Sequence, residues 1–543
     1  MKIIQEENIL KNLLKQASKL PEKTEGELHK LKKRFARDYK ISLPTNFQLQ
    51  TAYEELLKEG WKGEAVLQRL IRKRKIRTLS GVSVLTVLTK PYPCPGKCVF
   101  CPTEPGMPKS YLSNEPGAMR AVLDDFHPQD QVRTRLDSLT RQGHETEKIE
   151  MIVLGGTFSA YNRRYQTDFV RALFNACNKG LPKEKGPTGR SLEEAQRINE
   201  SAKHKIIGLS LETRPDHITE DEILNMRRLG CTKVQIGVQH IDQAVLDLNK
   251  RGEKIEDTIN AMKLLRDAGF KIATHLMPNL PGSTPELDLW VVQEFFRNPA
   301  FKPDQVKIYP CVVTPYAELE EWWREGRYQA YSDEVLMDLL YKIQLELPEY
   351  VRVERLFRDI PGESILEGSQ KTNMRQLLEE RMKADGKFCR CIRCREIRGE
   401  SYDPNATSLR IHEFDASDGK EFFISFNQAD PKDLLSQKDK LCSLLRMRYS
   451  SYSLQGKTHF IPELDGAALI REVHVYGAEV NVGSTKKTAS QHAGLGRRML
   501  EKAEELAKKD GFKKMAIIAG VGTRNYYRKW GYELEGTYMT KAL

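Results

Sequence analysis

Three cysteines lie close together in the stretch that begins at Cys94. Cys94, Cys98 and Cys101 are separated by three and then by two residues, and the loop that holds them contains Pro95 and Gly96, which disfavour a helix. Three thiolates on one short loop can bind three irons of a [4Fe–4S] cluster and leave the fourth iron open. The alternative is a zinc knuckle that takes its fourth ligand from elsewhere. The alternation of strands and helices after this loop favours the cluster.

The CxxxCxxC spacing resembles the cluster-binding motif of the radical-SAM superfamily. That resemblance implies that S-adenosylmethionine (SAM) binds the open iron through its amino and carboxylate groups. It also implies a need for an electron donor that reduces the cluster.

Strand-like and helix-like segments alternate from residue 80 onward, which predicts a parallel sheet or partial barrel covered by helices. Functional residues in such folds follow the C-terminal ends of strands. Gly155 and Gly156 follow one strand and permit close approach of a ligand such as the SAM amino group. Glu212 and Arg214 follow the next strand and suit the ammonium, ribose or carboxylate of SAM. The expected strands are 149–154, 206–211, 234–238, 272–277 and 306–309.

A second cysteine group follows a charged stretch, residues 330–385, for which we expect helices. The group is Cys389, Cys391 and Cys394, set among arginines. Thiolates this close together need a cation, and a structural Zn²⁺ is the simplest occupant. Free or redox-active thiols are the alternative. The candidates for a fourth ligand are Cys311 first, then His412 or Cys442.

The last part of the chain, residues 401–543, changes character. Strand-like runs cover 408–412, 422–426, 468–475 and 515–519. Between the last two, Gln491, Gly494, Leu495 and Gly496 open an amphipathic helix, and free N–H groups at such a helix start suit a pyrophosphate. This Gln-x-x-Gly-x-Gly pattern resembles the acetyl-CoA loop of GNAT acetyltransferases.

The combination of both patterns resembles the catalytic subunit of Elongator along nearly the whole chain. Compared with eukaryotic members, the first cysteine gap is compact, as in single-chain archaeal or bacterial forms. The stretches that carry the resemblance are 115–120, 155–158, 212–216, 277–282, 471–477 and 520–527.

The Elongator resemblance implies carboxymethylation of the wobble uridine in a tRNA anticodon stem-loop. A SAM-derived radical takes hydrogen from the methyl group of acetyl-CoA, the carbon radical adds to carbon 5 of the uridine, and thioester hydrolysis leaves the carboxymethyl group. The base must leave the anticodon stack to reach the barrel.

The same resemblance implies which residues meet acetyl-CoA. Tyr526 and Tyr527 are expected near the thioester, although one core ring and one exposed ring is the plain structural alternative. Lys148 is expected to reach the CoA from the barrel side, or else to be a solvated lysine at the strand edge. The remaining contacts are expected from Glu472, Val473, His474, Val475 and the Gly494–Gly496 loop.

Composition sets the broader expectations. The 543 residues carry a net charge of +12, and residues 1–80 hold 19 Lys and Arg against 10 Asp and Glu, which favours a polyanion such as tRNA over a merely solvated surface. No run of eighteen apolar residues or signal core occurs, so we expect a cytoplasmic protein without a membrane partner. Whether it is a homodimer stays open.

We therefore predict an α/β protein with four units. A basic helical tRNA-binding region (1–80) precedes a radical-SAM partial TIM-type barrel (81–370), a zinc-binding joint (371–400) and a GNAT-like acetyl-CoA-binding domain (401–543). The rival function is a protein lysine acetyltransferase with a structural iron–sulfur domain, which needs a general base. His474 and Glu472 are the candidates for that base. A non-catalytic RNA-binding scaffold is a further rival, but it leaves both cofactor patterns unexplained.

Overall fold

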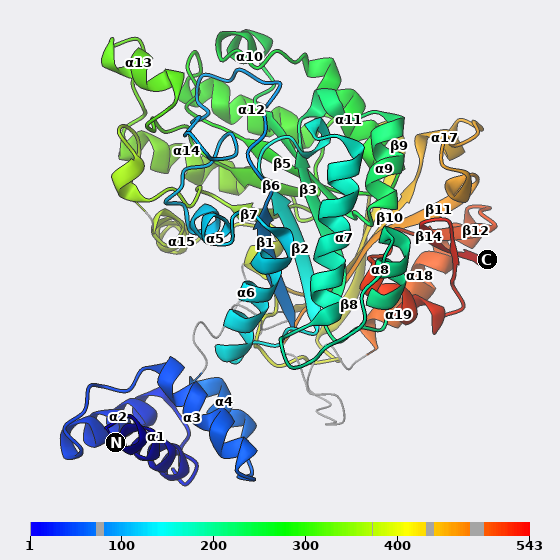
Figure 1. The fold of residues 1–543 in the computed structure, drawn as a ribbon. Coiled ribbons are helices and arrows are strands. Elements are labelled where there is room, and N and C mark those ends of the chain that lie inside the picture. The colour runs from blue at the N-terminus through cyan, green and yellow to red at the C-terminus, as the bar shows by residue number, and fades with distance from the viewer. Residues whose placement is uncertain (1, 72–80, 372, 430–438, 478–493) are drawn as a thin grey trace.

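The structure is a computed structural model that describes residues 2–71, 81–371, 373–429, 439–477 and 494–543. Figure 1 shows a small helical bundle at the N-terminus, a barrel-like sheet covered by helices, and a second sheet that carries the C-terminus. Among the described residues, no helix has both the length and the apolar sequence needed to cross a membrane.

The N-terminal bundle has a hydrophobic core of its own, in which leucines such as Leu13, Leu14 and Leu56 are buried. Tyr53 is buried and meets Trp61 edge to face at 5.3 Å between ring centroids, so these aromatic rings serve packing. The bundle consists of α1 (Lys2–Ala17), α2 (Glu25–Asp38), α3 (Asn46–Lys58) and α4 (Ala65–Ile71).

The first sheet has seven strands in the order β1 to β7, and each strand is parallel to the next. This confirms the predicted partial barrel. β7 is a correction, because it lies within the 330–385 stretch that we expected to be helical. The strands are β1 (Val82–Leu88), β2 (Lys148–Leu154), β3 (Lys205–Thr213), β4 (Lys233–Gln239), β5 (Lys271–Leu276), β6 (Gln305–Ile308) and β7 (Arg352–Arg355).

Helices connect and cover these strands. Their apolar faces pack on outward strand residues such as Val234, Ile236 and Val306, which are fully buried. The helices are α5 (Pro116–Leu123), α6 (Pro128–Arg141), α7 (Arg163–Lys179), α8 (Leu192–Asn199), α9 (Glu220–Arg228), α10 (Gln243–Leu248), α11 (Ile255–Asp267), α12 (Pro285–Arg297), α13 (Glu318–Arg324), α14 (Asp333–Glu346) and α15 (Met374–Ala384).

The interior side of the barrel is polar, because the alternate residues of several strands carry charges. The ammonium of Lys233 on β4 lies 2.7 Å from Glu150 on β2 and 3.0 Å from Glu354 on β7. One layer further along, the Lys307 ammonium donates to the Gln235 side chain. A polar interior of this kind suits a bound substrate better than a packed core would.

The second sheet has the strand order β13-β14-β12-β11-β10-β9-β8, and β11 and β12 are its parallel pair. The sequence did not indicate β10, β13 or β14. The strands are β8 (Thr407–Ala416), β9 (Gly419–Ala429), β10 (Asp439–Tyr449), β11 (Ala467–Val475), β12 (Lys514–Ile517), β13 (Glu533–Glu535) and β14 (Tyr538–Ala542), and the helices are α16 (Ile392–Arg395), α17 (Ser451–Leu454), α18 (Leu495–Lys509) and α19 (Arg524–Arg528).

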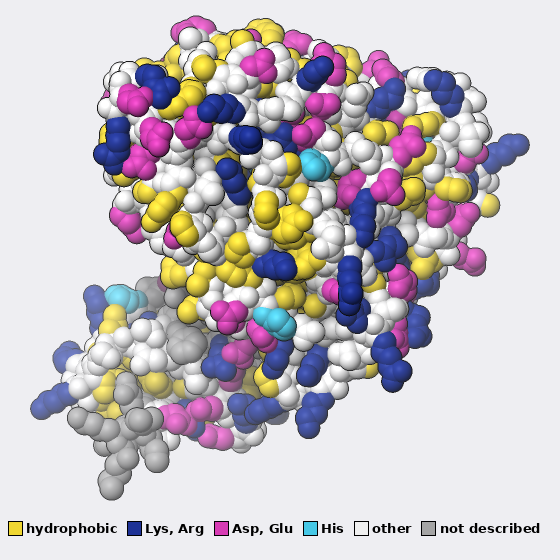
Figure 2. Space-filling model, turned by 45° about the horizontal axis from the view of Figure 1, so that its top comes forward, with side chains coloured by type: hydrophobic (Ala, Val, Ile, Leu, Met, Phe, Trp, Pro, Cys, Tyr) yellow, Lys and Arg dark blue, Asp and Glu magenta, His cyan; other side chains and the backbone are white. Residues whose placement is uncertain are grey.

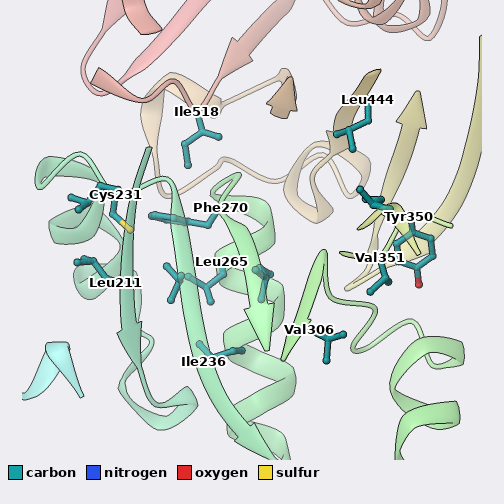
Figure 3. Packing of buried hydrophobic residues seen from close by; sticks show 14 of the residues in the cluster. Leu211, Cys231, Ile236, Leu265, Phe270, Val306, Tyr350, Val351, Leu444 and Ile518 are labelled. Atoms are coloured by element: carbon teal, nitrogen blue, oxygen red, sulfur yellow. The ribbon is translucent and has the colours of Figure 1, made fainter. Parts of the chain in front are cut away.

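The two sheets share one hydrophobic core. Figure 3 shows Phe270 of the barrel and Ile518 of the second sheet within the same buried cluster. Charges cross the joint as well: Arg448 of β10 donates to Asp267 at 2.8 and 2.6 Å, and both side chains are fully buried. Separating a buried ion pair is unfavourable because it leaves each charge without its partner. These contacts therefore fix the orientation of the two sheets.

Candidate active site

The first cysteine loop follows β1 and lies at the C-terminal end of the barrel strands. Cys94 Sγ lies 3.6 Å from Thr157 Oγ1, and Arg251 Nη1 donates to Cys98 Sγ at 3.3 Å. A hydrogen bond from Cys101, aided by the positive charge of Arg251, lowers the pKa of Cys98 to about 5. A thiolate held among guanidinium groups suits the predicted iron–sulfur cluster.

The turn after β2 brings Thr157 to the cysteine loop, and it requires glycine. Gly155 and Gly156 have φ angles of 131° and 88°. A Cβ atom on Gly155 would lie 1.9 Å from Thr89 Oγ1, so no larger residue fits there. The two glycines therefore expose backbone at the edge where SAM is expected.

Glu212 and Arg214 lie at the same end of the barrel. Glu212 accepts a hydrogen bond from Tyr111 at 2.9 Å, and burial raises the pKa of its carboxyl. Arg214 donates to Asp216 at 2.9 and 2.8 Å, whereas its Nη1 is buried without a partner among the described residues. That nitrogen faces the cysteine loop, because a Cβ atom on Gly96 would lie 2.4 Å from it.

A pocket of about 890 Å³ opens at the other end of the barrel strands. Lys233, Gln305 and other barrel residues line one part of it, and Glu472 of β11 and Tyr527 of α19 line another part. The cysteines do not line this pocket, since the polar layer that contains Gln235 lies between. The pocket therefore opens at the N-terminal ends of the barrel strands, and the cysteine loop lies at their C-terminal ends.

The wall formed by β11 offers open backbone groups. The pairing of β11 with β12 ends at Ile470 and Ile517, so the edge of residues 472–475 that faces β12 takes no part in the described ladder. Although burial opposes it, the charges of Lys271 and Arg446 lower the pKa of Glu472, whose carboxylate lies 2.5 and 2.9 Å from them.

The neighbouring side chains complete this wall. Val473 and His474 line the pocket, and burial lowers the pKa of the His474 imidazole. Val475 packs against the shared core, and its side chain lies 3.7 Å from a Cβ placed on Gly496.

The two tyrosines of α19 take different positions. Tyr527 is 7% exposed and lines the pocket, whereas Tyr526 is 39% exposed and meets it edge to face at 5.2 Å. A Cβ atom on Gly496 would lie 2.8 Å from the Tyr526 hydroxyl, so this tyrosine faces the start of α18. Gly494 precedes that helix with a φ of 67°, and Leu495 is buried as its first residue. Gln491 lies outside the described residues.

The position of Lys148 fits the second alternative, that of a lysine at the strand edge. It is the first residue of β2, its side chain is exposed, and it is not among the residues that line the pocket.

The second cysteine group forms a compact cluster. The sulfur atoms of Cys389, Cys391 and Cys394 lie within 4.8 Å of one another, as metal ligands would. The segment joins the two sheets, because Ile392 N donates to Val351 O at 2.9 Å and Glu396 bridges Leu441 of β10.

The expected fourth ligands lie elsewhere. Cys311, our first candidate, is buried in a separate cluster beside Cys98, and burial raises its pKa to about 12. His412 stacks on Tyr350 at 6.1 Å, and Cys442 Sγ lies 3.7 Å from Lys440 O. Cys311 therefore lies apart from the cluster of three, which corrects its assignment as the fourth ligand.

Two protein-family models match the barrel part of the chain. Residues 92–289 match the model of the Radical SAM superfamily, and residues 303–384 match that of the Radical_SAM C-terminal domain. A tRNA uridine(34) acetyltransferase from Methanocaldococcus infernus is 39% identical and covers 98% of both chains. The chain belongs to the family of tRNA uridine(34) acetyltransferases and Elongator complex protein 3.

Further relatives span bacteria and eukaryotes. A tRNA uridine(34) acetyltransferase from Dehalococcoides mccartyi is 42% identical over 87% of this chain and 100% of its own length. Elongator complex protein 3 from Dictyostelium discoideum is 38% identical over 87% of this chain and 84% of its own. The solved structure of the archaeal M. infernus Elp3, with residues 1–46 deleted, has a TM-score of 0.72 at 38% identity and covers 85% of this chain and 99% of that one.

Several side chains of this family member escaped the sequence analysis. Thr157 and Arg251 contact the cysteine loop, and Lys233 and Glu354 line the pocket. One signal could have identified Lys233: a charged residue within a strand of a buried parallel sheet must have a partner or a ligand. Glu354 gave no such signal, because its stretch reads as a helix. Arg251 offered no such signal, since it lies in a loop.

Proposed function

We propose that this protein forms 5-carboxymethyluridine at the wobble position of tRNA from a SAM-derived radical and acetyl-CoA. The observation that carries the proposal is the pocket shared by the barrel and the C-terminal unit, because Lys233 of β4 and Tyr527 of α19 line the same space. A base that entered this space would lie between the expected acetyl-CoA wall and the barrel interior.

The C-terminal ends of the barrel strands fit the cofactors of a radical-SAM enzyme. Cys94, Cys98 and Cys101 would hold the [4Fe–4S] cluster, which together with SAM supplies radical chemistry when bound. The unpartnered Nη1 of Arg214 and the open backbone at Gly156 would bind SAM. An electron donor is required for the same chemistry.

The pocket at the N-terminal ends of the barrel strands fits acetyl-CoA. The edge of residues 472–475 that no described strand pairs with offers N–H and C=O groups to an amide-bearing chain, and the start of α18 at Gly494–Gly496 offers N–H groups to a pyrophosphate. In this proposal Tyr527 orients the thioester and Tyr526 supports the loop. The ion pairs of Glu472 with Lys271 and Arg446 hold that strand in place.

The remaining units follow from the same proposal. Residues 1–80 and the basic face bind tRNA, and Lys and Arg side chains gather toward the lower right of the face shown in Figure 2. Residues 81–370 act as the radical-SAM unit and 401–543 as the acetyl-CoA unit. Zinc at Cys389, Cys391 and Cys394 would stabilise the joint of residues 371–400.

A lysine acetyltransferase fits the site less well. Of the two candidates for its general base, Glu472 is tied by two cations and its lowered pKa makes it a weak base, which leaves only His474 in the pocket. The pocket also leads into the barrel, whose Glu150, Lys233 and Glu354 would have no role in such a reaction.

The test is an anaerobic assay with reduced protein, SAM, acetyl-CoA and tRNA, read by mass analysis of the nucleosides. We expect carboxymethyluridine from the native protein and none from Cys98→Ala. A product that survives Cys98→Ala, or lysine acetylation without any SAM cleavage, would contradict the proposal.

A further inference from the structure

Three arginines line the outer part of the shared pocket without an ion-pair partner among the described residues. Arg375 belongs to α15, Arg393 to α16, and Arg398 to the turn that follows. Nη2 of Arg375 is buried and makes no hydrogen bond within the described part of the chain. A shielded guanidinium nitrogen without an acceptor indicates a missing anionic ligand, because leaving such a group unpaired costs free energy.

Backbone contacts hold the other two arginines in place. Arg393 Nη1 donates to the carbonyl of Glu354 at 3.0 Å, and Arg398 Nη2 donates to the carbonyl of Arg393 at 3.1 Å. Each contact uses one nitrogen and leaves the rest of the guanidinium available. Arg393 and Arg398 are therefore anchored by backbone carbonyls without being neutralised, and together with Arg375 we call them the arginine rim.

The carboxylates near the arginine rim do not neutralise it. Glu396 lines the same pocket, but it forms an ion pair with Arg352. Glu379 lies one helical turn from Arg375 on α15 and lines the same pocket, and the described residues show no ion pair between the two. The buried arginines at the joint of the two sheets behave differently: Arg448 and Arg471, for example, each pair with carboxylates.

Phosphate is the anion that best matches several guanidinium groups on one wall. Two phosphate sources can reach this pocket, namely CoA and RNA. The CoA pyrophosphate already has a candidate site at Gly494–Gly496, at the start of α18. The arginine rim belongs instead to α15 and the cysteine joint and lines the pocket, whereas the described residues 494–496 are not among the lining residues.

We propose that the arginine rim binds a backbone phosphate of RNA next to the nucleotide that enters the pocket. The inference rests on the proposed function and deepens it, because it names the contact that holds the RNA strand while the base leaves its stack. Positioning of this kind comes from phosphate contacts, which carry no base specificity themselves.

The test measures binding of an anticodon stem-loop RNA to the full-length protein, by fluorescence anisotropy over a series of salt concentrations. Arg375→Gln and Arg398→Gln each remove one charge, and Arg375→Lys keeps the charge. Lys383→Gln is the matched control, since Lys383 is an exposed cation of the same helix that does not line the pocket. Thermal melting verifies that each variant folds.

Each Gln variant is expected to bind the RNA about tenfold more weakly at moderate salt and to lower the slope of log Kd against log salt by about 0.7, the value for one single-strand phosphate contact. Arg375→Lys should keep most of the slope, and Lys383→Gln should match the native protein. Acetyl-CoA affinity, measured by calorimetry on the same proteins, should not change in any variant.

Two results would overturn the assignment. Unchanged RNA binding in both Gln variants would show that the rim meets no RNA phosphate, and a loss of acetyl-CoA affinity alone would assign the rim to CoA. The proposed function has a separate readout: if native protein still forms carboxymethyluridine while the Gln variants bind RNA normally, only this inference fails. If the native protein binds no RNA, both fail.

Discussion

Lys233 offers the sharpest test of the barrel interior, because its ammonium is the shared partner of two carboxylates. Its side chain is 6% exposed and lies 2.7 Å from Glu150 and 3.0 Å from Glu354. Replacing it with Met keeps the aliphatic length and removes the charge. The two carboxylates then face each other inside the barrel without their common cation.

Breaking one buried ion pair by removal of a partner costs about 3–5 kcal/mol, because a buried charge is left uncompensated. Lys307 also faces Glu354, at 4.0 Å, and offsets part of that loss. We therefore take the lower bound of about 3 kcal/mol. At about 2–4 °C per kcal/mol for a unit of this size, Lys233→Met should lower the melting temperature by about 6 °C or more.

The loss should depend on pH with a definite sign. Although burial opposes it, Lys233 and Lys307 lower the pKa of Glu354 to about 2, so the stability from this carboxylate is present above its unfolded value of about 4.3 and is lost only as pH falls toward 2. In Lys233→Met, burial without the cation raises the folded pKa instead. That penalty is full at neutral pH and declines as the carboxyl groups take up protons.

The assay is thermal melting of cluster-loaded protein under anaerobic conditions at pH 7 and pH 5. The gap in melting temperature between native protein and Lys233→Met should be larger at pH 7. Lys203→Met is the control, because Lys203 forms an exposed pair with Glu184, and such pairs contribute less than about 1 kcal/mol. A gap below that of the control, or one that is equal at both pH values, would refute the reasoning.

Three further predictions concern the rest of the site. Gly155→Ala should lower the melting temperature and the iron content of anaerobically purified protein, because its Cβ would lie 1.9 Å from Thr89 Oγ1; normal iron content would contradict this. Asp304→Asn should weaken acetyl-CoA binding in calorimetry and leave SAM binding intact, since Asp304 holds Arg471 at 2.9 Å beside the β11 wall; equal losses for both ligands would indicate general unfolding. Cys389→Ser should remove zinc and keep iron in elemental analysis, and the reverse outcome would exclude the zinc assignment.

Much of the fold could be predicted because local patterns and local structure agree. The expected strand at 149–154 is β2, which begins one residue earlier, and the expected strand at 234–238 lies within β4. The two cysteine groups could also be predicted to bind metal, because the spacing of thiolates along the chain reflects the geometry of a metal site. These features depend on residues that are close in sequence.

The failures share a physical cause, which is that partners distant in sequence decide the outcome. β7 is short and charged, with Arg352 and Glu354 among its four residues, so it reads as part of a polar helix. It forms a strand because its backbone pairs with that of β6, and its Glu354 meets Lys233, which lies 121 residues earlier. Cys311 was assigned to zinc from residue type alone, whereas the strand order places it beside Cys98.

The contacts between the two sheets are the part of the structure that the sequence predicts least. Arg446, Arg448 and Arg471 lie in strands where a reader of the sequence would place them on a solvated face, yet all three are buried. Their partners Asp267 and Asp304 belong to the barrel. Buried pairs add little net stability compared with apolar residues, but separating them is strongly unfavourable. Such pairs therefore serve to hold one relative orientation of the two sheets, and the shared pocket exists only in that orientation.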